Sequence, residues 1–403
     1  KPQIALCTGS YNKYWMRLIL SHPLTVRKIT MELITRLVYI DTSAYERKHF
    51  QFGLYILEKL ENFASDDKVR ILVTDITRRE IELHIRKNAE EALKELNKFQ
   101  KTYAPILRTT PAHVPTEIFV KPDAEAVISD ALASFKQFLE CEGVEEISVQ
   151  NINPLLVFEK YFTNAPPFDQ PGKKKEFPDA FTLEAINEIA EKRAHRVYIV
   201  SEDKDLISAS EQNEIFIHLS SIQTLVDLLI RNDEDLEDMA SFADDVFDKL
   251  RDSITERIKE YLIEMECIPE GADYHDVETG EFEIEDVVLS SPKLTDVNRD
   301  SANYELSAKL TIKADLHYPD YERSPWDPED KAYAFVFESV STFIFHQTVG
   351  LNIEIGFNDG IKENAEIIDL QFDDSYILLD ADKGTLVSKT DNFFDDDNDM
   401  GVE

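Results

Sequence analysis

The sequence predicts an α/β fold, in which a mostly parallel sheet has helices on both faces, followed by a C-terminal antiparallel β-rich domain. Two observations support this prediction. Short apolar runs alternate with amphipathic stretches over residues 33–230, as in a parallel sheet whose strands are connected by helices. Beyond Gly280 the apolar residues recur at every second position, which is typical of strands with one buried face.

The α/β part has its elements in a regular order. Apolar runs predict strands over residues 37–40, 69–74, 196–201 and 215–217, with a further strand near residues 116–120. Helical spacing predicts helices over residues 50–63, 77–96, 123–141, 181–193 and 221–230. Thr77 is the expected N-cap of its helix, with Glu80 at capping-box spacing. Pro and Gly crowd residues 153–172, which predicts a loop.

The C-terminal part is predicted from alternation. Over residues 304–318 the even positions are apolar or aromatic, so Leu306, Leu310, Ile312 and Leu316 are expected to face a core. Further strands are expected over residues 332–345, 351–357, 367–372 and 376–379. Together these segments predict an antiparallel sheet or sandwich.

Composition divides the chain into five segments. Residues 1–30 form a basic appendage, which is either a basic arm or, as its composition slightly favours, sequence upstream of a natural start at Met31. Residues 31–230 form the α/β domain, with a helical insertion near residues 100–172. An acidic linker and helix over residues 231–280 leads to the β-rich domain at 281–390. Residues 391–403 form an acidic tail that is predicted to be disordered.

The net charge of −37 limits the functions that the chain can have. Phosphate contacts need Lys and Arg, so such acidity argues against nucleic-acid binding unless a metal ion and local basic clusters compensate. The three cysteines are far apart and form no zinc-ligand spacing, which indicates a reducing compartment. No apolar run approaches the ~20 residues of a membrane span. We therefore expect a cytoplasmic protein with no membrane association.

Acidic residues occur where the predicted strands meet helices. Asp41 follows the first strand, Glu80 lies early in the helix after the second, and Asp179 opens a later helix. Asp203 and Asp205 follow the strand at 196–201. The carboxyl ends of parallel strands form one edge, so these acids can converge there. Clustered carboxylates repel one another unless a cation lies among them, and Mg²⁺ or Mn²⁺ prefers such oxygen ligands.

This ordered set of acids resembles that of the PIN-domain nuclease family. The matching elements are Asp41-Thr42-Ser43, Glu80, Asp179 and the run Ser201-Glu202-Asp203-Lys204-Asp205. The resemblance covers residues 33–230, although the stretch between Glu80 and Asp179 is longer than in compact family members. It implies a PIN-like fold with Asp41, Glu80, Asp179 and Asp203 as catalytic residues. It also implies Mg²⁺ or Mn²⁺ held by these four residues and Asp205.

Several polar residues near these acids are candidates for substrate binding. The cluster Lys173-Lys174-Lys175 precedes Asp179 and could neutralise phosphates, although a solvated loop is an equally good interpretation. Thr42, Ser43 and Ser201 could hold a metal-bound water or orient a carboxylate, although purely structural hydroxyls are more common.

The resemblance implies an endonuclease that acts on RNA as a toxin, an RNA-processing enzyme or a defence effector. Its acidic C-terminal domain is suited to docking a protein partner or inhibitor. One alternative is a structure-specific DNA nuclease, and another is a non-catalytic binding protein with a degenerate site. The sequence contains no HExxH, GxSxG, Walker or GxGxxG motif, so no competing catalytic motif is present.

Overall fold

The computed structural model describes residues 32–109, 114–169, 175–270, 277–321, 323–327, 331–357, 365–380 and 382–391. The predicted appendage at 1–30, the tail beyond residue 391, and Lys173 and Lys174 lie outside these ranges. From Leu33 onward the chain forms one unit, so contacts cross the expected boundary at residue 230.

A five-stranded parallel sheet organises the first half, in the order β3-β2-β1-β4-β5. Its strands are β1 (Leu37–Ile40), β2 (Arg70–Thr74), β3 (Val144–Ile147), β4 (Val197–Val200) and β5 (Phe216–Leu219). Every residue of β1 and β4 is buried, because both strands are central and both of their faces are covered. The apolar runs that predicted β1 and β4 are therefore explained by burial on both faces, whereas the edge strand β5 is only partly buried.

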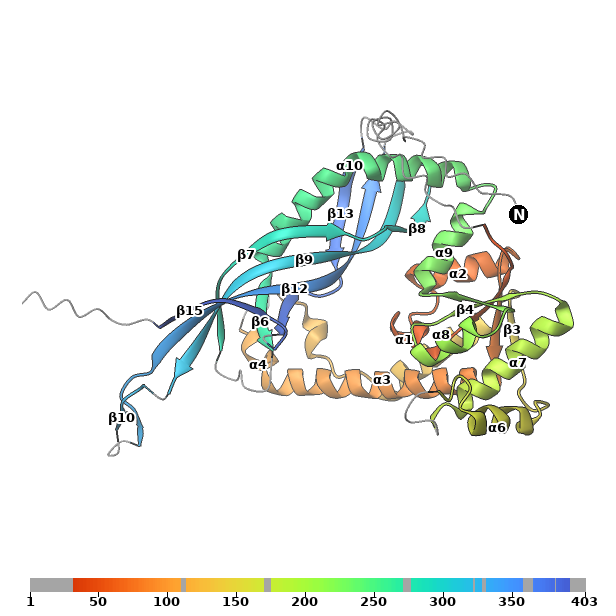
Figure 1. The fold of residues 1–403 in the computed structure, drawn as a ribbon, viewed down its shortest axis with the longest axis horizontal. Helices are drawn as coiled ribbons and strands as arrows, with labels where there is room; N and C mark the ends of the chain where they lie inside the picture. Colours follow the sequence, from red (N-terminus) through yellow and green to blue (C-terminus); the bar gives the residue numbers. More distant parts are fainter. Residues whose placement is uncertain are drawn as a thin grey trace, which may run out of the picture. The chain divides into compact units, whose positions relative to one another are not determined.

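Helices cover both faces of this sheet, as the sequence predicted (Figure 1). Val38 and Ile40 of β1 belong to one apolar core, whereas Leu37 and Tyr39 belong to the other. On the first face lie α1 (Thr42–Glu46), α2 (Tyr55–Ser65), α3 (Asp75–Thr102), α5 (Ala124–Leu139) and α9 (Ile222–Arg231). On the second lie α6 (Pro154–Thr163), α7 (Phe177–Arg193) and α8 (Lys204–Glu211).

Four local predictions in this half were wrong. Residues 116–119 form the short 3-10 helix η1 (Thr116–Phe119), not a strand, because β-branched and aromatic residues indicate only a preference. The expected loop at 153–172 contains α6, whose Pro154 occupies the first turn, where proline is tolerated. Helix α3 begins one turn earlier than expected, with Thr74 and not Thr77 as its N-cap. The insertion near 100–172 also contributes β3 to the sheet, besides α4 (Ala104–Leu107), α5 and α6.

The second half contains a six-stranded antiparallel sheet, which confirms the predicted β-rich class. Its members are β7 (Glu278–Leu289), β8 (Lys293–Val297), β9 (Ser301–Asp320), β12 (Phe337–Gly356), β13 (Glu366–Phe372) and β15 (Thr385–Asp391). The predicted side chains Leu306, Leu310, Ile312 and Leu316 are all buried along β9. Residues 337–345 of the stretch expected at 332–345, and residues 351–356 of that expected at 351–357, belong to the single strand β12. Residues 332–333 form a separate short strand, and residues 334–336 belong to no strand.

Two short strand pairs lie outside this sheet. Strands β10 (Trp326–Asp327) and β11 (Ala332–Tyr333) pair antiparallel, whereas β6 (Glu266–Glu270) and β14 (Tyr376–Asp380) pair parallel. The parallel pair was not predicted, because its two strands are far apart in the sequence.

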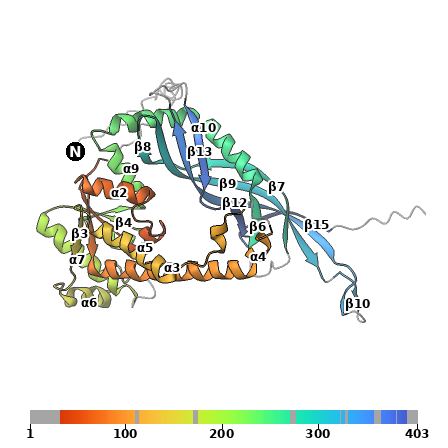
Figure 2. The same cartoon turned by 180° about the vertical axis from the view of Figure 1, so that it is seen from behind.

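Helix α10 (Glu237–Glu264) covers one face of the antiparallel sheet, as Figures 1 and 2 show. It contacts β7, β8 and β13, and Phe247 packs against Tyr304 of β9 with ring centroids 4.8 Å apart. The stretch expected to be a linker and helix is therefore also part of the core. Within the described ranges, no helix combines the length and the apolar character needed to cross a bilayer.

Candidate active site

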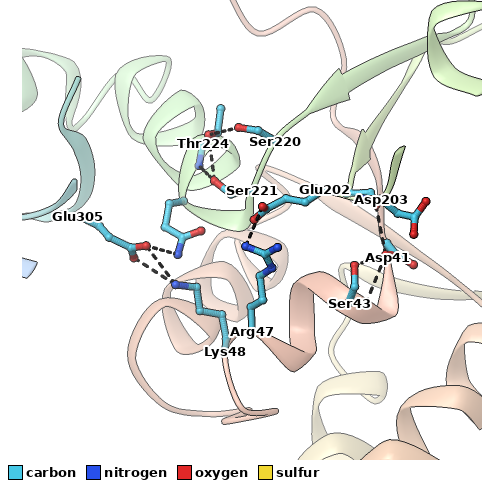
Figure 3. A network of polar contacts seen from close by, with 12 residues as sticks. Asp41, Ser43, Arg47, Lys48, Glu202, Asp203, Ser220, Ser221, Thr224 and Glu305 are labelled. Carbon is cyan, nitrogen blue, oxygen red and sulfur yellow. Dashed lines mark hydrogen bonds and ion pairs between the residues drawn. The ribbon is translucent and has the colours of Figure 1, made fainter. Parts of the chain in front are cut away.

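Asp41 and Asp203 lie at the same edge of the parallel sheet. Strands β1 and β4 pair in parallel, with Ile40 opposite Val200, and each acid follows the end of its strand. The backbone N–H of Asp41 donates to the carbonyl of Val200 at 3.0 Å, which extends this pairing by one residue. Figure 3 shows the two acids close together at this edge.

Three hydrogen bonds orient the Asp41 carboxylate, and all three reach Oδ2. The donors are the backbone N–H of Ser43 at 3.3 Å, the Ser43 hydroxyl, and the Ser201 hydroxyl at 3.2 Å. Asp41 is also the N-cap of α1. Burial raises the pKa of Asp41 above its ordinary value despite these donors, and the nearby Asp203 raises it further. The Asp41 carboxylate is therefore held by two serines that are far apart in the sequence, Ser43 and Ser201.

Glu80 reaches the same edge from α3. The Thr42 hydroxyl donates to its Oε2 at 3.2 Å, so α1 orients this carboxylate as well as that of Asp41. Burial raises the pKa of Glu80, and Asp41 adds to the shift. Glu80 is therefore more than a solvated helix residue.

Asp179 is the most strongly perturbed of the predicted acids. Burial, then repulsion from Asp41, Glu80 and Glu176, raises its pKa to about 8. Glu176, just before α7, accepts a hydrogen bond from the protonated Asp179, and its own pKa is raised by burial and by Asp205 and Asp203. Without a cation this pair therefore holds a proton near neutral pH.

A chain of buried hydroxyls lies beneath these acids. Tyr39 lies 3.2 Å from Thr77, which lies 2.9 Å from Thr74, which in turn lies 3.1 Å from Thr182, all measured between hydroxyl oxygens. These residues belong to β1, α3, the end of β2, and α7. The chain therefore connects the first turn of α3, which carries Glu80, to the second turn of α7, which carries Asp179.

Asp203 and Asp205 lie around the start of α8. Asp203 is its N-cap and accepts from the backbone N–H of Asp205 at 2.7 Å, while its own N–H donates to the Ser201 hydroxyl at 3.0 Å. Burial raises the pKa of Asp205, as do Asp203 and Asp169. The buried Oδ1 of Asp205 has no hydrogen-bond partner among the described residues. Such an oxygen is a candidate cation ligand.

All the acids that the sequence predicted lie close enough to influence one another's pKa. Asp41 interacts with Asp203 and Asp179, Asp179 with Glu80 and Glu176, and Glu176 with Asp203 and Asp205. As they stand, no three Asp, Glu, His or Cys side chains in the described ranges form a group that could hold a metal ion. The donor chemistry nevertheless fits a hard cation, because the cluster is all oxygen, is repulsive, and contains the unpaired Asp205 Oδ1.

The residues predicted to bind substrate fall into two groups: three hydroxyls that contact the carboxylates, and the exposed Lys175. Thr42, Ser43 and Ser201 bind the carboxylates directly, so they orient acids. Lys175 is exposed just before α7, next to Glu176, where its charge opposes the rise in the pKa of Glu176 that burial and Asp205 cause. Near the cluster, Arg47 also forms an ion pair with Glu202 at 2.7 Å, as seen in Figure 3.

Glu176 and the four hydroxyls were missed by sequence reasoning. The signal for Glu176 was its position three residues before Asp179, nearly one helical turn away. The hydroxyls gave no usable signal, because Thr74 and Thr182 become neighbours only when β2 and α7 pack together.

Comparison with protein families supports the resemblance stated above. A family model described as a PIN domain matches residues 38–206. Comparison with curated proteins and with solved structures gave no match. The matched range contains the whole acidic cluster, from Asp41 to Asp205, and four of the five parallel strands. Residues 38–206 of this chain therefore form a domain of the PIN family.

Proposed function

We propose that residues 38–206 are a metal-dependent nuclease that hydrolyses phosphodiester bonds, with RNA as the preferred substrate. The observation that carries this proposal is the convergence of Asp41, Glu80, Asp179 and Asp203 from four different elements onto one edge. Repulsion between these carboxylates lowers the stability of the fold, so acids with a purely structural role would not be expected to cluster in this way. PIN domains are typically metal-dependent nucleases, which agrees with this arrangement.

The ion would be Mg²⁺ or Mn²⁺, held by the four acids together with Asp205. When bound, it would polarise a phosphate oxygen and activate water for an in-line displacement. The residues of the chain prepare this site: Ser43 and Ser201 fix one carboxylate of the cluster, and Thr42 fixes Glu80. The proton shared by Asp179 and Glu176 must leave the pair when a cation is bound, because a metal ligand has to be deprotonated.

The cellular role belongs to the same proposal: a toxin, RNA-processing or defence nuclease in the cytoplasm. The three scattered cysteines support a reducing compartment. The residues from 231 onward hold 46 of the 80 acidic residues, so we expect them to dock a basic protein partner or inhibitor.

The proposal is tested by cleavage of labelled RNA and DNA in Mg²⁺ or Mn²⁺. The unmodified chain should cut RNA faster than DNA, and EDTA should stop the reaction. Asp179→Asn should abolish cleavage, because an amide cannot balance the charge of the ion. Asp252→Asn, the same change at an exposed position on α10, should leave the rate unchanged. Faster DNA cleavage would favour a structure-specific DNA nuclease.

A non-catalytic binding protein is the second candidate. It is favoured by the finding that no three described acids already form a metal-binding group. Absence of both cleavage and Mn²⁺ binding in the unmodified chain would exclude the nuclease and leave this alternative.

A further inference from the structure

Two hollows follow one another along helix α3. The first, of about 630 Å³, is lined by Arg78, Arg79 and Arg86 of α3 and by Lys136 of α5. The second, of about 730 Å³, is lined by Lys94, Lys98 and Lys101 of α3 and by Lys121 just before α5. Residues near the end of α5 line the first hollow and its first residue lines the second, so the two helices run antiparallel.

Four of the lining cations share one face of α3. Arg79, Arg86, Lys94 and Lys101 are spaced by seven or eight residues, which is two helical turns. At 1.5 Å per residue the row is about 33 Å long. We call these two hollows and the cations along them the α3–α5 groove. Its cations are spaced so that an extended polymer could contact several of them.

The charge of this groove is opposite to that of the chain. The two hollows are lined by eight Lys or Arg residues and by four acids, Glu82, Glu90, Glu140 and Glu146, whereas the whole chain has 43 basic and 80 acidic residues. A basic row on so acidic a protein attracts polyanions locally, whereas the acidic remainder of the chain repels them.

Several of these cations are open to a ligand. Arg86 and Lys94 are exposed, and no ion pair is described for either within the described ranges. Arg78 pairs with Glu146 at 3.3 Å, but its buried Nε has no partner among the described residues. Leu83, which lines the first hollow, is 64% exposed. An apolar side chain among arginines is suited to a single-stranded nucleic acid, whose bases can contact the apolar side chain while its phosphates contact the arginines.

The position of the groove links it to the acidic cluster. Arg78 and Arg79 immediately precede Glu80, so the groove begins within one turn of a candidate metal ligand. We propose that the α3–α5 groove binds the phosphate backbone of a single-stranded nucleic acid and leads the strand to the acidic edge. This inference rests on the proposed nuclease function, but the binding itself requires no cleavage.

The test is therefore a binding measurement in EDTA, on the full chain, with labelled single-stranded RNA and DNA 20-mers. Arg86→Ala with Lys94→Ala removes one cation from each hollow. Affinity should fall several-fold, and the slope of log affinity against log salt should flatten by about 1.4, at about 0.7 per phosphate contact. The matched control, Arg257→Ala with Lys313→Ala, removes the same charge from exposed positions on α10 and β9 and should change neither quantity.

Three outcomes would contradict the proposal that the α3–α5 groove binds a nucleic acid. The first is an unchanged salt slope in the groove variant, and the second is an equal loss of affinity in the control variant. The third is competition by polyglutamate as effective as that by unlabelled RNA, which would indicate a peptide-binding surface. Failure of the nuclease proposal would give a different result. The chain would not cleave the nucleic acid, but it would still bind the 20-mers, and the Arg86→Ala, Lys94→Ala variant would still bind them more weakly.

Discussion

The Ser201 hydroxyl lies 3.2 Å from Oδ2 of Asp41, although the two residues are 160 positions apart in the sequence. Ser201 is fully buried, and its oxygen also accepts from the backbone N–H of Asp203. One side chain therefore fixes both the acid after β1 and the turn that carries the acid after β4.

Replacing Ser201 with Ala should destabilise the fold. The change leaves the Asp203 N–H without its acceptor and removes one of the three donors to Asp41, at a cost of about 1–3 kcal/mol in the free energy of unfolding. Urea denaturation measures this loss. Ser253→Ala, at an exposed position on α10, should change stability by no more than about 0.5 kcal/mol. Equal stability of the two variants would show that the buried hydroxyl has no role.

Stability of the metal-free protein should fall as the pH rises toward 8. The folded pKa of Asp179 is about 8, and an unfolded Asp has a pKa of about 3.9. Because the folded state binds this proton more tightly, the stabilisation is complete below the unfolded pKa and is lost as pH rises through the folded pKa. Thermal melts in EDTA from pH 6 to 9 should show the decline, and Asp179→Asn should flatten it. A decline of the same size in Asp179→Asn would assign the effect to other groups.

Cation binding should release a proton. At pH 7 a group with a pKa of about 8 is mostly protonated, so Mn²⁺ binding should expel about one proton from the Asp179–Glu176 pair. Calorimetric titration in two buffers of different ionisation enthalpy counts the protons released. Mn²⁺ should also raise the melting temperature of the unmodified chain by mass action, but not that of Asp41→Asn. Binding with no proton release at pH 7 would contradict the assignment of Asp179 as a ligand.

Arg231 at the end of α9 forms ion pairs with Asp227, at 2.9 Å, and with Asp244 of α10, and all three side chains are largely buried. Tyr304 of β9 donates to Asp244 at 3.2 Å. Arg231→Met should cost about 3–5 kcal/mol, because it leaves two buried carboxylates without their cation. Arg257→Met, an exposed match on α10, should have little effect in the same urea titration. A small loss in Arg231→Met would mean that water reaches these carboxylates.

Much of the fold could be predicted because burial on two faces leaves a continuous apolar run, as in Val197–Val200. Strand β3 was missed because its sequence, VEEI, has two acids, which an edge strand tolerates. Helix α1 was missed because five residues are too few for a helical period. Residues near strand ends were easier to predict than residues brought together by packing, because topology alone places strand ends along one edge.

In the acidic cluster too, the residues at strand ends could be predicted to lie close together, whereas the contacts made by helix packing could not. Asp41 and Asp203 follow adjacent parallel strands, so their proximity follows from sheet topology. The approach of Asp179 to Glu80 depends on how α7 packs beside α3, and on a hydroxyl pair between Thr74 and Thr182. No periodicity in the sequence encodes that contact.

The parallel pairing of β6 with β14 has a consequence for synthesis on the ribosome. Tyr376 lies opposite Glu266 in this pair, so the partner strand emerges 110 residues later. At about 5–20 residues per second, β6 waits about 5–20 s with its backbone unpaired. The newly made chain therefore exposes the edge of β6, the strand that contains Cys267, until β14 has been synthesised. Slowing or stalling the ribosome between these two strands would prolong the period in which the chain can associate with another copy.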